Sequence, residues 1–170
     1  IQWPTTYLQL MKKYSLNIDE RVNRGVDLFM AGHNCAQSVV GAFADIYGIS
    51  FSLAMRMAAS FGAGIGRQRL TCGAVSGMCL LAGLENGSAD IDPRVRGVNY
   101  ALVQQLCDAF RAENGPITCA ELLGMKKALA NSAVPSERNA EYYAKRPCAR
   151  MVASACRIFA TYLDSLQMPD

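Results

Sequence analysis

The stretch DPRVRGVNYALVQQLCDAFRAENG, residues 92–115, carries the clearest structural pattern in this sequence of 170 residues. Asp92 is a typical helix N-cap, Pro93 fits the first turn that follows, and Gly115 provides a stop. Between them apolar side chains recur at helical spacing, at Val95, Val98, Leu102, Leu106 and Phe110. The stretch therefore predicts one long amphipathic helix.

The same signals recur along most of the chain. Apolar side chains repeat at helical spacing over residues 17–32, 35–48, 51–62 and 147–166. No stretch alternates apolar and polar residues in the way that predicts a β-strand. Residues 125–146 are rich in alanine, with serine and proline, and predict a partly irregular connection. We therefore expect an all-α, single-domain helical bundle over residues 1–170, with cysteines at helix N-termini.

Composition and charge exclude several classes of protein. The net charge is +3 and there is no long basic run, so we expect no nucleic-acid binding. The longest apolar run, residues 70–84, is interrupted by glycines and is shorter than the roughly 18–20 residues of a membrane span, so we expect no membrane insertion. There is no Ser/His/Asp or paired-carboxylate constellation, which argues against a hydrolase.

The seven cysteines bear on the compartment. An odd count in a chain of this length does not suit a secreted disulfide framework. No signal peptide is visible, so we expect a cytoplasmic, reducing environment. An export signal upstream of Ile1 would change that prediction.

Four cysteines share one local setting, in the tetrapeptides NCAQ (34–37), TCGA (71–74), TCAE (118–121) and PCAR (147–150). Each of these residues, Cys35, Cys72, Cys119 and Cys148, stands at a predicted helix start. Asn34 with Gln37 and Thr118 with Glu121 predict capping boxes, and Thr71 suits an N-cap. The first turn of a helix has unpaired N–H groups and the positive end of the macrodipole, which favour thiolate over thiol.

The other three cysteines lie inside helical patterns among apolar neighbours, at Cys79, Cys107 and Cys156. Cysteines in this position usually behave as small buried hydrophobic residues. If the four helix starts converge, their thiolates form a site suited to an iron–sulfur cluster, to zinc, or to a pair of redox disulfides. No CxxC or CxxCH motif is present to choose among these alternatives, and we expect His33 to lie outside the ligand set.

The glycine-rich stretch FGAGIGRQR, residues 61–69, needs a separate interpretation. Its G-x-G-x-G pattern follows a predicted helix and differs from the G-x-G-x-x-G of dinucleotide folds, so we do not expect a nucleotide site. It predicts either a plain helix connector or a loop that brings backbone N–H groups and Arg67 or Arg69 near Cys72. The candidate cofactor-binding residues beside the cysteines are Gly64, Gly66, Arg67 and Gly73.

Four motifs in order, NCAQSVVGAF, FGAGIGRQRLTCGAVSG, TCAELLG and CARMV, resemble the C-GCAxxG-C-C family of redox-active proteins. The family's CGAxxG element corresponds to residues 72–77, and its other three cysteines correspond to Cys35, Cys119 and Cys148. The resemblance covers about residues 22–162, and residues 1–16 and 134–145 have no clear counterpart.

This resemblance implies a small helical domain with redox activity. A related domain in split-Soret cytochromes implies an iron–sulfur centre, whereas the haem of those proteins does not carry over because this chain has no haem motif. Family members are often encoded near transporter genes, which implies a redox partner linked to a membrane transporter.

Three function classes remain open. The leading hypothesis is an electron-transfer protein in which Cys35, Cys72, Cys119 and Cys148 bind an iron–sulfur cluster. The second is a thiol–disulfide oxidoreductase that uses the same cysteines in pairs, and the third is a structural zinc or interaction module without turnover. Whether the protein is an enzyme depends on this choice. The redox partner is unidentified, and the sequence is compatible with a homo-oligomer.

Overall fold

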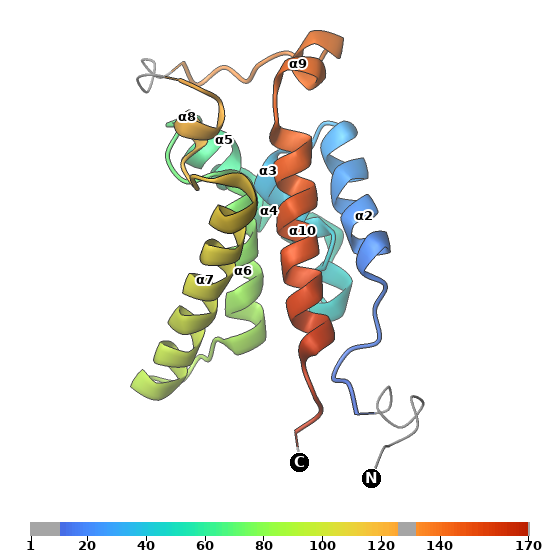
Figure 1. Cartoon of the computed structure of the whole chain (residues 1–170), viewed down its shortest axis with the longest axis vertical. Coiled ribbons are helices and arrows are strands. Elements are labelled where there is room, and N and C mark those ends of the chain that lie inside the picture. The colour runs from blue at the N-terminus through green and yellow to red at the C-terminus, as the bar shows by residue number, and fades with distance from the viewer. Residues whose placement is uncertain (1–10, 126–131, 170) are drawn as a thin grey trace.

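Four long helices form the body of the computed structural model, which describes residues 11–125 and 132–169. They are α2 (Ile18–Met30), α6 (Gly73–Asn86), α7 (Pro93–Asn114) and α10 (Cys148–Ser165). α10 packs against the other three and lies between α2 and the α6–α7 pair (Figure 1). No β-strand occurs in these residues, so the predicted all-α class is confirmed. The structure does not describe residues 1–10, 126–131 and 170. Parts of two predictions, the single domain over residues 1–170 and the irregular connection over residues 125–146, therefore lie outside the described residues.

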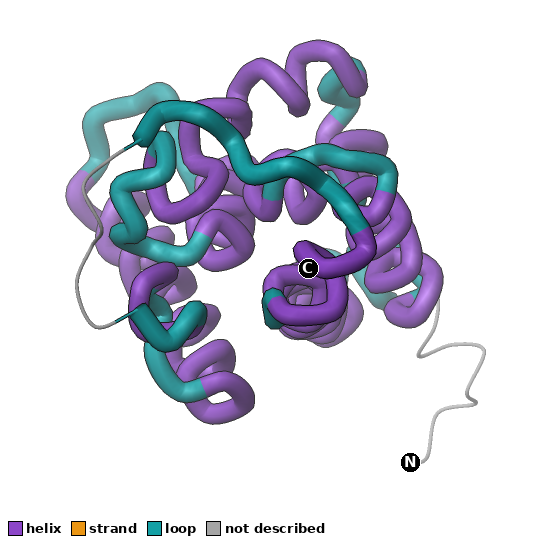
Figure 2. Tube along the Cα trace, turned by 90° about the horizontal axis from the view of Figure 1, so that it is seen from above, coloured by secondary structure: helices purple, strands orange, loops and turns teal. Residues whose placement is uncertain are grey.

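Short helices complete the chain: α3 (Cys35–Gly41), η1 (Ala44–Tyr47), α4 (Phe51–Ala58), η2 (Ala59–Phe61), α5 (Gly62–Ile65), α8 (Cys119–Leu122) and α9 (Ala140–Lys145). α5, α8 and α9 lie at the end of the bundle where α6 and α10 begin (Figure 1). Viewed onto this end, the loop that leads into α9 crosses over the bundle (Figure 2). No helix in the described ranges is long and apolar enough to cross a membrane.

The predicted helix boundaries are largely those of the structure, with two exceptions. The N-cap Asp92 accepts a backbone hydrogen bond from Arg94 as predicted, and Ser50 caps α4 by accepting one from Leu53. The helix predicted over residues 51–62 is α-helical only to Ala58, and the 3₁₀ helix η2 follows it. The helix predicted over residues 35–48 is interrupted, because α3 ends at Gly41 and a 3₁₀ turn follows. Phe43 lies at this interruption and is completely buried. Its ring meets the ring of Phe159 edge-on, with the two ring centres 5.0 Å apart. Tertiary packing thus overrides the local helical pattern here.

Close approach of the helices depends on small residues at their crossings. A Cβ atom on Gly25 of α2 would lie 2.5 Å from the Sγ of Cys156 on α10. A Cβ on Gly77 of α6 would lie 2.8 Å from the Cβ of Val39 on α3. These glycines let α2, α3, α6 and α10 share one core, in which Phe29, Phe110 and Leu163 are among the buried side chains.

Glu85 ties the N-terminal segment to the last turn of α6. Its side chain is 1% exposed and pairs with the Lys13 ammonium. The hydroxyls of Tyr14 and Tyr47 donate to its Oε2 at 2.7 and 2.9 Å. Burial alone would raise the pKa of Glu85, but the hydrogen bonds from Lys13, Tyr14 and Tyr47 together outweigh burial and lower it.

Replacing Glu85 by glutamine is expected to lower the free energy of unfolding at pH 7 by about 2 kcal/mol, because a neutral amide accepts weaker hydrogen bonds and leaves Lys13 without its charge partner. The folded pKa lies below the ordinary value of 4.5, so the carboxylate's contribution is complete above that pH and is lost as the pH falls through the folded pKa. Urea unfolding of the wild-type protein and of the glutamine variant, measured from neutral to acid pH, should show the difference in their free energies of unfolding shrink as the pH falls. A difference that does not change with pH would contradict this account.

Candidate functional site

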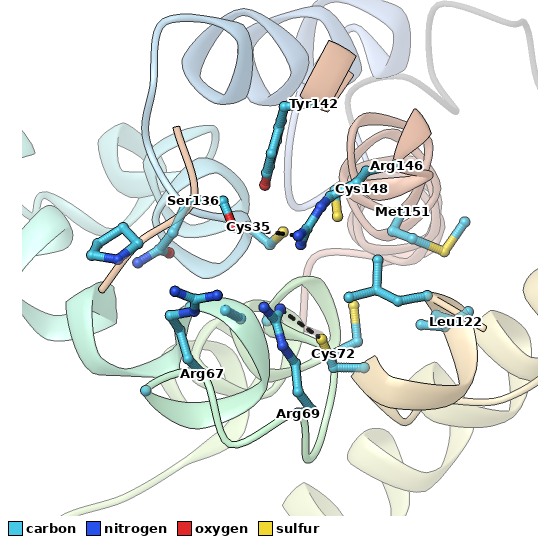
Figure 3. A pocket seen from close by; sticks show the side chains of 18 of the residues that line it. Cys35, Arg67, Arg69, Cys72, Leu122, Ser136, Tyr142, Arg146, Cys148 and Met151 are labelled. Atoms are coloured by element: carbon cyan, nitrogen blue, oxygen red, sulfur yellow. Dashed lines mark hydrogen bonds between the residues drawn. The ribbon is translucent and has the colours of Figure 1, made fainter. Parts of the chain in front are cut away.

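Cys35, Cys72, Cys119 and Cys148 line one cavity of about 390 Å³ at the end of the bundle (Figure 3). Cys35, Cys119 and Cys148 are the first residues of α3, α8 and α10, and Cys72 directly precedes α6. Three of them are buried, Cys148 is half-buried, and all four are free thiols. Four helix starts far apart in the sequence therefore meet at one place.

Cys35 is held by a complete capping box. The Asn34 side chain accepts from the backbone N–H of Gln37 at 2.9 Å, and the Gln37 side chain accepts from that of Asn34 at 3.0 Å. The amide of Asn34 also donates to the carbonyl of Ala59 at 3.0 Å, which joins the start of α3 to η2. The predicted box thus fixes the first cysteine and part of the cavity wall.

Cys72 and Cys119 are brought together by backbone pairing. The N–H of Cys72 donates to the carbonyl of Ile117 at 2.7 Å, and the N–H of Cys119 donates to that of Leu70 at 2.6 Å. Thr71 and Thr118 form an isolated antiparallel bridge between these bonds. A pairing that joins residues so far apart in the chain leaves no local signal in the sequence.

The same pairing corrects two predictions about caps. Cys72, and not Thr71, is the N-cap of α6, because Thr71 is in extended backbone within the bridge. The capping box predicted for Thr118 and Glu121 is not formed, since the Thr118 side chain makes no cap hydrogen bond. α8 is only four residues long and is held by the bridge rather than by its cap.

The two glycines of the CGAxxG element, Gly73 and Gly77, lie where an added side chain would collide with neighbouring segments. A Cβ on Gly73 would lie 3.0 Å from the carbonyl oxygen of Phe61 and 3.1 Å from the Cβ of Cys35. Gly77, one helical turn later on the same face, meets Val39 of α3 in the same way. Both glycines let α6 begin directly against α3, which places Cys72 near Cys35.

The glycine-rich loop has an unusual backbone. Five consecutive residues adopt positive φ angles: Ala63 (54°), Gly64 (73°), Ile65 (64°), Gly66 (57°) and Arg67 (65°). Left-handed backbone costs roughly 1–2 kcal/mol for each residue other than glycine. The loop is therefore more than a plain connector, since it stores strain that the surrounding contacts must offset.

Three of the four candidate cofactor-binding residues line the cavity, namely Gly66, Arg67 and Gly73. Gly64 does not line it. A Cβ on Gly64 would lie 2.6 Å from the backbone nitrogen of Leu70, so this glycine allows the loop to fold back on itself. Gly64 thus shapes the loop that carries Arg67 and Arg69.

Among the described residues, four arginines line the cavity and no aspartate or glutamate does. Arg67 and Arg69 extend from the glycine-rich loop towards the cysteines, and Arg146 approaches from the opposite wall (Figure 3). Arg69 is only 6% exposed and donates to the Sγ of Cys119 at 3.8 Å. The sequence had suggested Arg67 or Arg69 beside Cys72, and both in fact line the cavity.

Arg138 is the fourth arginine, and sequence reasoning missed it. Its guanidinium lies 4.5 Å from the ring centre of Phe29 and 4.7 Å from that of Tyr142. It also donates to the carbonyl oxygens of Phe29 and His33 at 3.2 and 3.1 Å. These contacts fix the segment before α9 over the cavity. The ring of His33 does not line the cavity and packs against Phe51.

The four thiols are tuned unequally. The interaction with Cys35, together with Arg146, Arg138 and Arg69, lowers the pKa of Cys148 to about 7. The interaction with Cys148 and burial raise the pKa of Cys35. Burial raises the pKa of Cys72 to about 11, against the opposing effect of the nearby backbone N–H groups of Ala74 and Val75. Burial likewise raises the pKa of Cys119, against the opposing effect of Arg69. Of the four thiols only Cys148 has a lowered pKa; burial raises the pKa of the other three, and at Cys35 the neighbouring Cys148 raises it most.

Among the residues that the structure describes, four thiols line this cavity, beside the hydroxyls of Ser136 and Tyr142. Across residues 11–125 and 132–169, no three His, Cys, Asp or Glu side chains are arranged so that they could hold a single metal ion as they stand. The cysteine sulfurs instead surround an open space, with arginine side chains beside them. The chemistry available here is that of thiols, whether free, paired, or bound to a larger group.

Two of the remaining cysteines also form a pair that the sequence did not suggest. Cys79 of α6 and Cys107 of α7 hydrogen-bond to each other, which lowers the pKa of Cys107 to about 7 and raises that of Cys79. Cys107 and Cys156 are buried as predicted, whereas Cys79 is only half-buried. Cys156 is fully buried, and burial raises its pKa to about 12.

Replacing Cys156 by alanine should lower the free energy of unfolding by about 1–2 kcal/mol, because a buried sulfur is removed opposite Gly25. The thiol chemistry of the cavity should be unchanged. Chemical denaturation measures the first effect, and thiol titration of the folded protein measures the second. Loss of redox behaviour in this variant would mean that Cys156 belongs to the site.

Comparison with family models matches residues 33–162 to the family described as "Putative redox-active protein (C_GCAxxG_C_C)". This confirms the resemblance carried by the four motifs, although the match begins at residue 33 and not near residue 22. Comparison with curated proteins and with solved structures gave no match. The match spans well over half of the sequence and includes all four cysteines of the cavity, so the chain belongs to the C_GCAxxG_C_C family.

Proposed function

We propose that the protein is an electron carrier in which Cys35, Cys72, Cys119 and Cys148 hold an iron–sulfur cluster. The observation that carries this proposal is the meeting of four thiols, from four separate helix starts, around one cavity. Four cysteine thiolates are the usual ligands of such clusters. The description of the family as redox-active agrees with this assignment.

The residues present fit such a group chemically. Thiols of four cysteines line the cavity, and in the part of the chain that the structure describes no carboxylate competes with them there. The cavity provides room between the sulfurs that a simple disulfide would not require. When bound, a cluster supplies one-electron chemistry whose potential depends on net charge, solvent exposure and hydrogen bonds to sulfur.

The chain's own residues would set that potential. The backbone N–H groups of Ala74 and Val75 favour the thiolate of Cys72, and Arg69 donates to the Cys119 sulfur. The cavity arginines offset the negative charge of four thiolates, which favours the reduced, more negative state of the site. Burial of Cys35, Cys72 and Cys119 limits the access of water.

A potentiometric titration tests electron transfer separately from metal binding. Protein loaded anaerobically with iron and sulfide is reduced stepwise with dithionite and then reoxidised, while its visible absorption and paramagnetic resonance are followed. We expect reversible one-electron bleaching. Bound iron and sulfide that cannot be reduced and reoxidised would indicate a purely structural centre and contradict the proposal.

One observation favours a second candidate, a dithiol–disulfide function. Cys35 and Cys148 already hydrogen-bond to each other, and one partner of an exchange pair needs a lowered pKa, as Cys148 has. This candidate requires only two cysteines. Metal-free protein would then show a two-electron thiol couple that Cys35→Ser abolishes and Cys72→Ser leaves intact.

A further inference from the structure

The four arginines of the cavity have no carboxylate partner among the described residues. None of them lies within 4.0 Å of a carboxylate in the described parts of the chain. Elsewhere in these parts five arginines form an ion pair with an aspartate or glutamate and three do not; the five are Arg21, Arg24, Arg94, Arg111 and Arg157, and the three are Arg56, Arg96 and Arg150. What distinguishes the cavity is that four guanidinium groups without a counter-charge are gathered in one place around the cysteines.

Two of the four arginines are already occupied. Arg138 donates to two backbone carbonyls and stacks on aromatic rings. Arg146 donates to the Ser136 hydroxyl at 3.3 Å and lies over the Tyr142 ring. Both guanidinium groups thus have structural partners that hold the segment around α9.

Arg67 and Arg69 are different. Arg67 makes no side-chain hydrogen bond or ion pair with the described residues, and Arg69 has only the sulfur of Cys119 as a side-chain partner. Both residues have left-handed backbone, with φ of 65° and 61°. Burial, Arg69 and Arg146 lower the pKa of Arg67, as expected where cations are gathered without an anion. A strained loop thus presents two guanidinium groups to a cavity that contains no acidic side chain.

We infer that the cavity binds a small oxyanion between Arg67 and Arg69, beside the cysteine sulfurs. The paired N–H donors of guanidinium suit carboxylate, phosphate and sulfur oxyanions, whose oxygens accept them in bidentate fashion. The volume of about 390 Å³ is at the small end of ligand pockets, which favours a compact anion over a nucleotide. The inference goes beyond the proposed function, because anion binding at these arginines requires neither a cluster nor a disulfide.

Calorimetric titration of the reduced, metal-free full chain tests the inference. Sodium phosphate, sodium sulfate and sodium acetate are titrated separately at low ionic strength, so that the three arms distinguish the class of oxyanion. We expect one-to-one binding of at least one of them, weakened by added sodium chloride. Arg67→Met and Arg69→Met should each weaken binding at least about tenfold, because each removes a charge-assisted hydrogen-bonding group.

Arg94→Met is the matched control, because it removes the same charge from a side chain that is 92% exposed and far from the cavity lining. It should leave anion binding unchanged. Circular dichroism establishes that each variant is folded. If Arg69→Met does not fold, Arg67→Met alone tests the inference, because Arg67 is less buried than Arg69.

Three results would overturn the inference: no binding of any probe at millimolar concentration, equal weakening by Arg94→Met, or binding that survives both cavity substitutions. If anion binding is absent and Arg67→Met instead lowers the iron content of reconstituted protein, the arginines serve the thiolates alone. Failure of anion binding leaves the cluster proposal standing, since that is measured separately by iron and sulfide content.

Discussion

Replacing Gly64 by alanine is expected to lower the free energy of unfolding by about 3 kcal/mol, a large share of the stability of an ordinary domain. The new Cβ would require left-handed backbone at φ 73° and would lie 2.6 Å from the nitrogen of Leu70 and 2.7 Å from the Cα of Arg69. Backbone atoms cannot move aside as a flexible side chain can. The loop must therefore open, which displaces Arg67 and Arg69 from the cavity. Urea unfolding measures the loss of stability.

Gly66→Ala is the matched control for this prediction. Gly66 lies in the same loop with a φ of 57°, but its added Cβ would find nothing nearer than 4.0 Å. This substitution should lower the free energy of unfolding only by the roughly 1–2 kcal/mol that left-handed backbone costs a residue other than glycine. If the two variants are equally destabilised, the close contact at Gly64 is unimportant and the account of the loop is wrong.

Replacing Cys72 by serine should remove most of the iron and sulfide that the chain binds after anaerobic reconstitution. The substitution changes only one atom, but a hydroxyl stays protonated and is a poor ligand for iron where a thiolate is a good one. The measurement is iron and acid-labile sulfide per chain.

Cys79→Ser provides the control on the same helix. Cys79 lies in α6 but does not line the cavity, so its substitution should leave iron and sulfide unchanged. Equal loss in both variants would show that serine disturbs α6 as a whole and that the effect at Cys72 is not one of ligation.

The helices could be predicted because their signals are local. Asp92, Pro93 and Gly115 bound α7 as the sequence indicates, and the Asn34–Gln37 capping box forms as expected. The CGAxxG element could be recognised, but its physical reason, the close approach of α6 to α3, needed the structure.

The remaining features of the site depend on contacts between distant residues. The backbone pairing of residues 70–72 with residues 117–119 brings Cys72 beside Cys119, and nothing in either stretch alone predicts it. Arg138 comes from a segment without helical periodicity, and its role appears only where it meets Phe29. The unequal pKa values of the four cysteines also depend on tertiary contacts, because burial and neighbouring side chains oppose the effect of a helix start at Cys35, Cys72 and Cys119.

Anaerobic reconstitution of the wild-type chain with ferrous iron and sulfide tests the central claim most directly. Iron and sulfide per chain are determined together with visible absorption near about 400 nm, where iron–sulfur clusters absorb. We predict that both elements are bound in comparable amounts, that the absorption develops with them, and that the thiols of Cys35, Cys72, Cys119 and Cys148 become protected from alkylation together. A colourless protein without iron, whose cavity thiols titrate instead as one clean two-electron couple, would contradict the cluster and assign the site to dithiol chemistry.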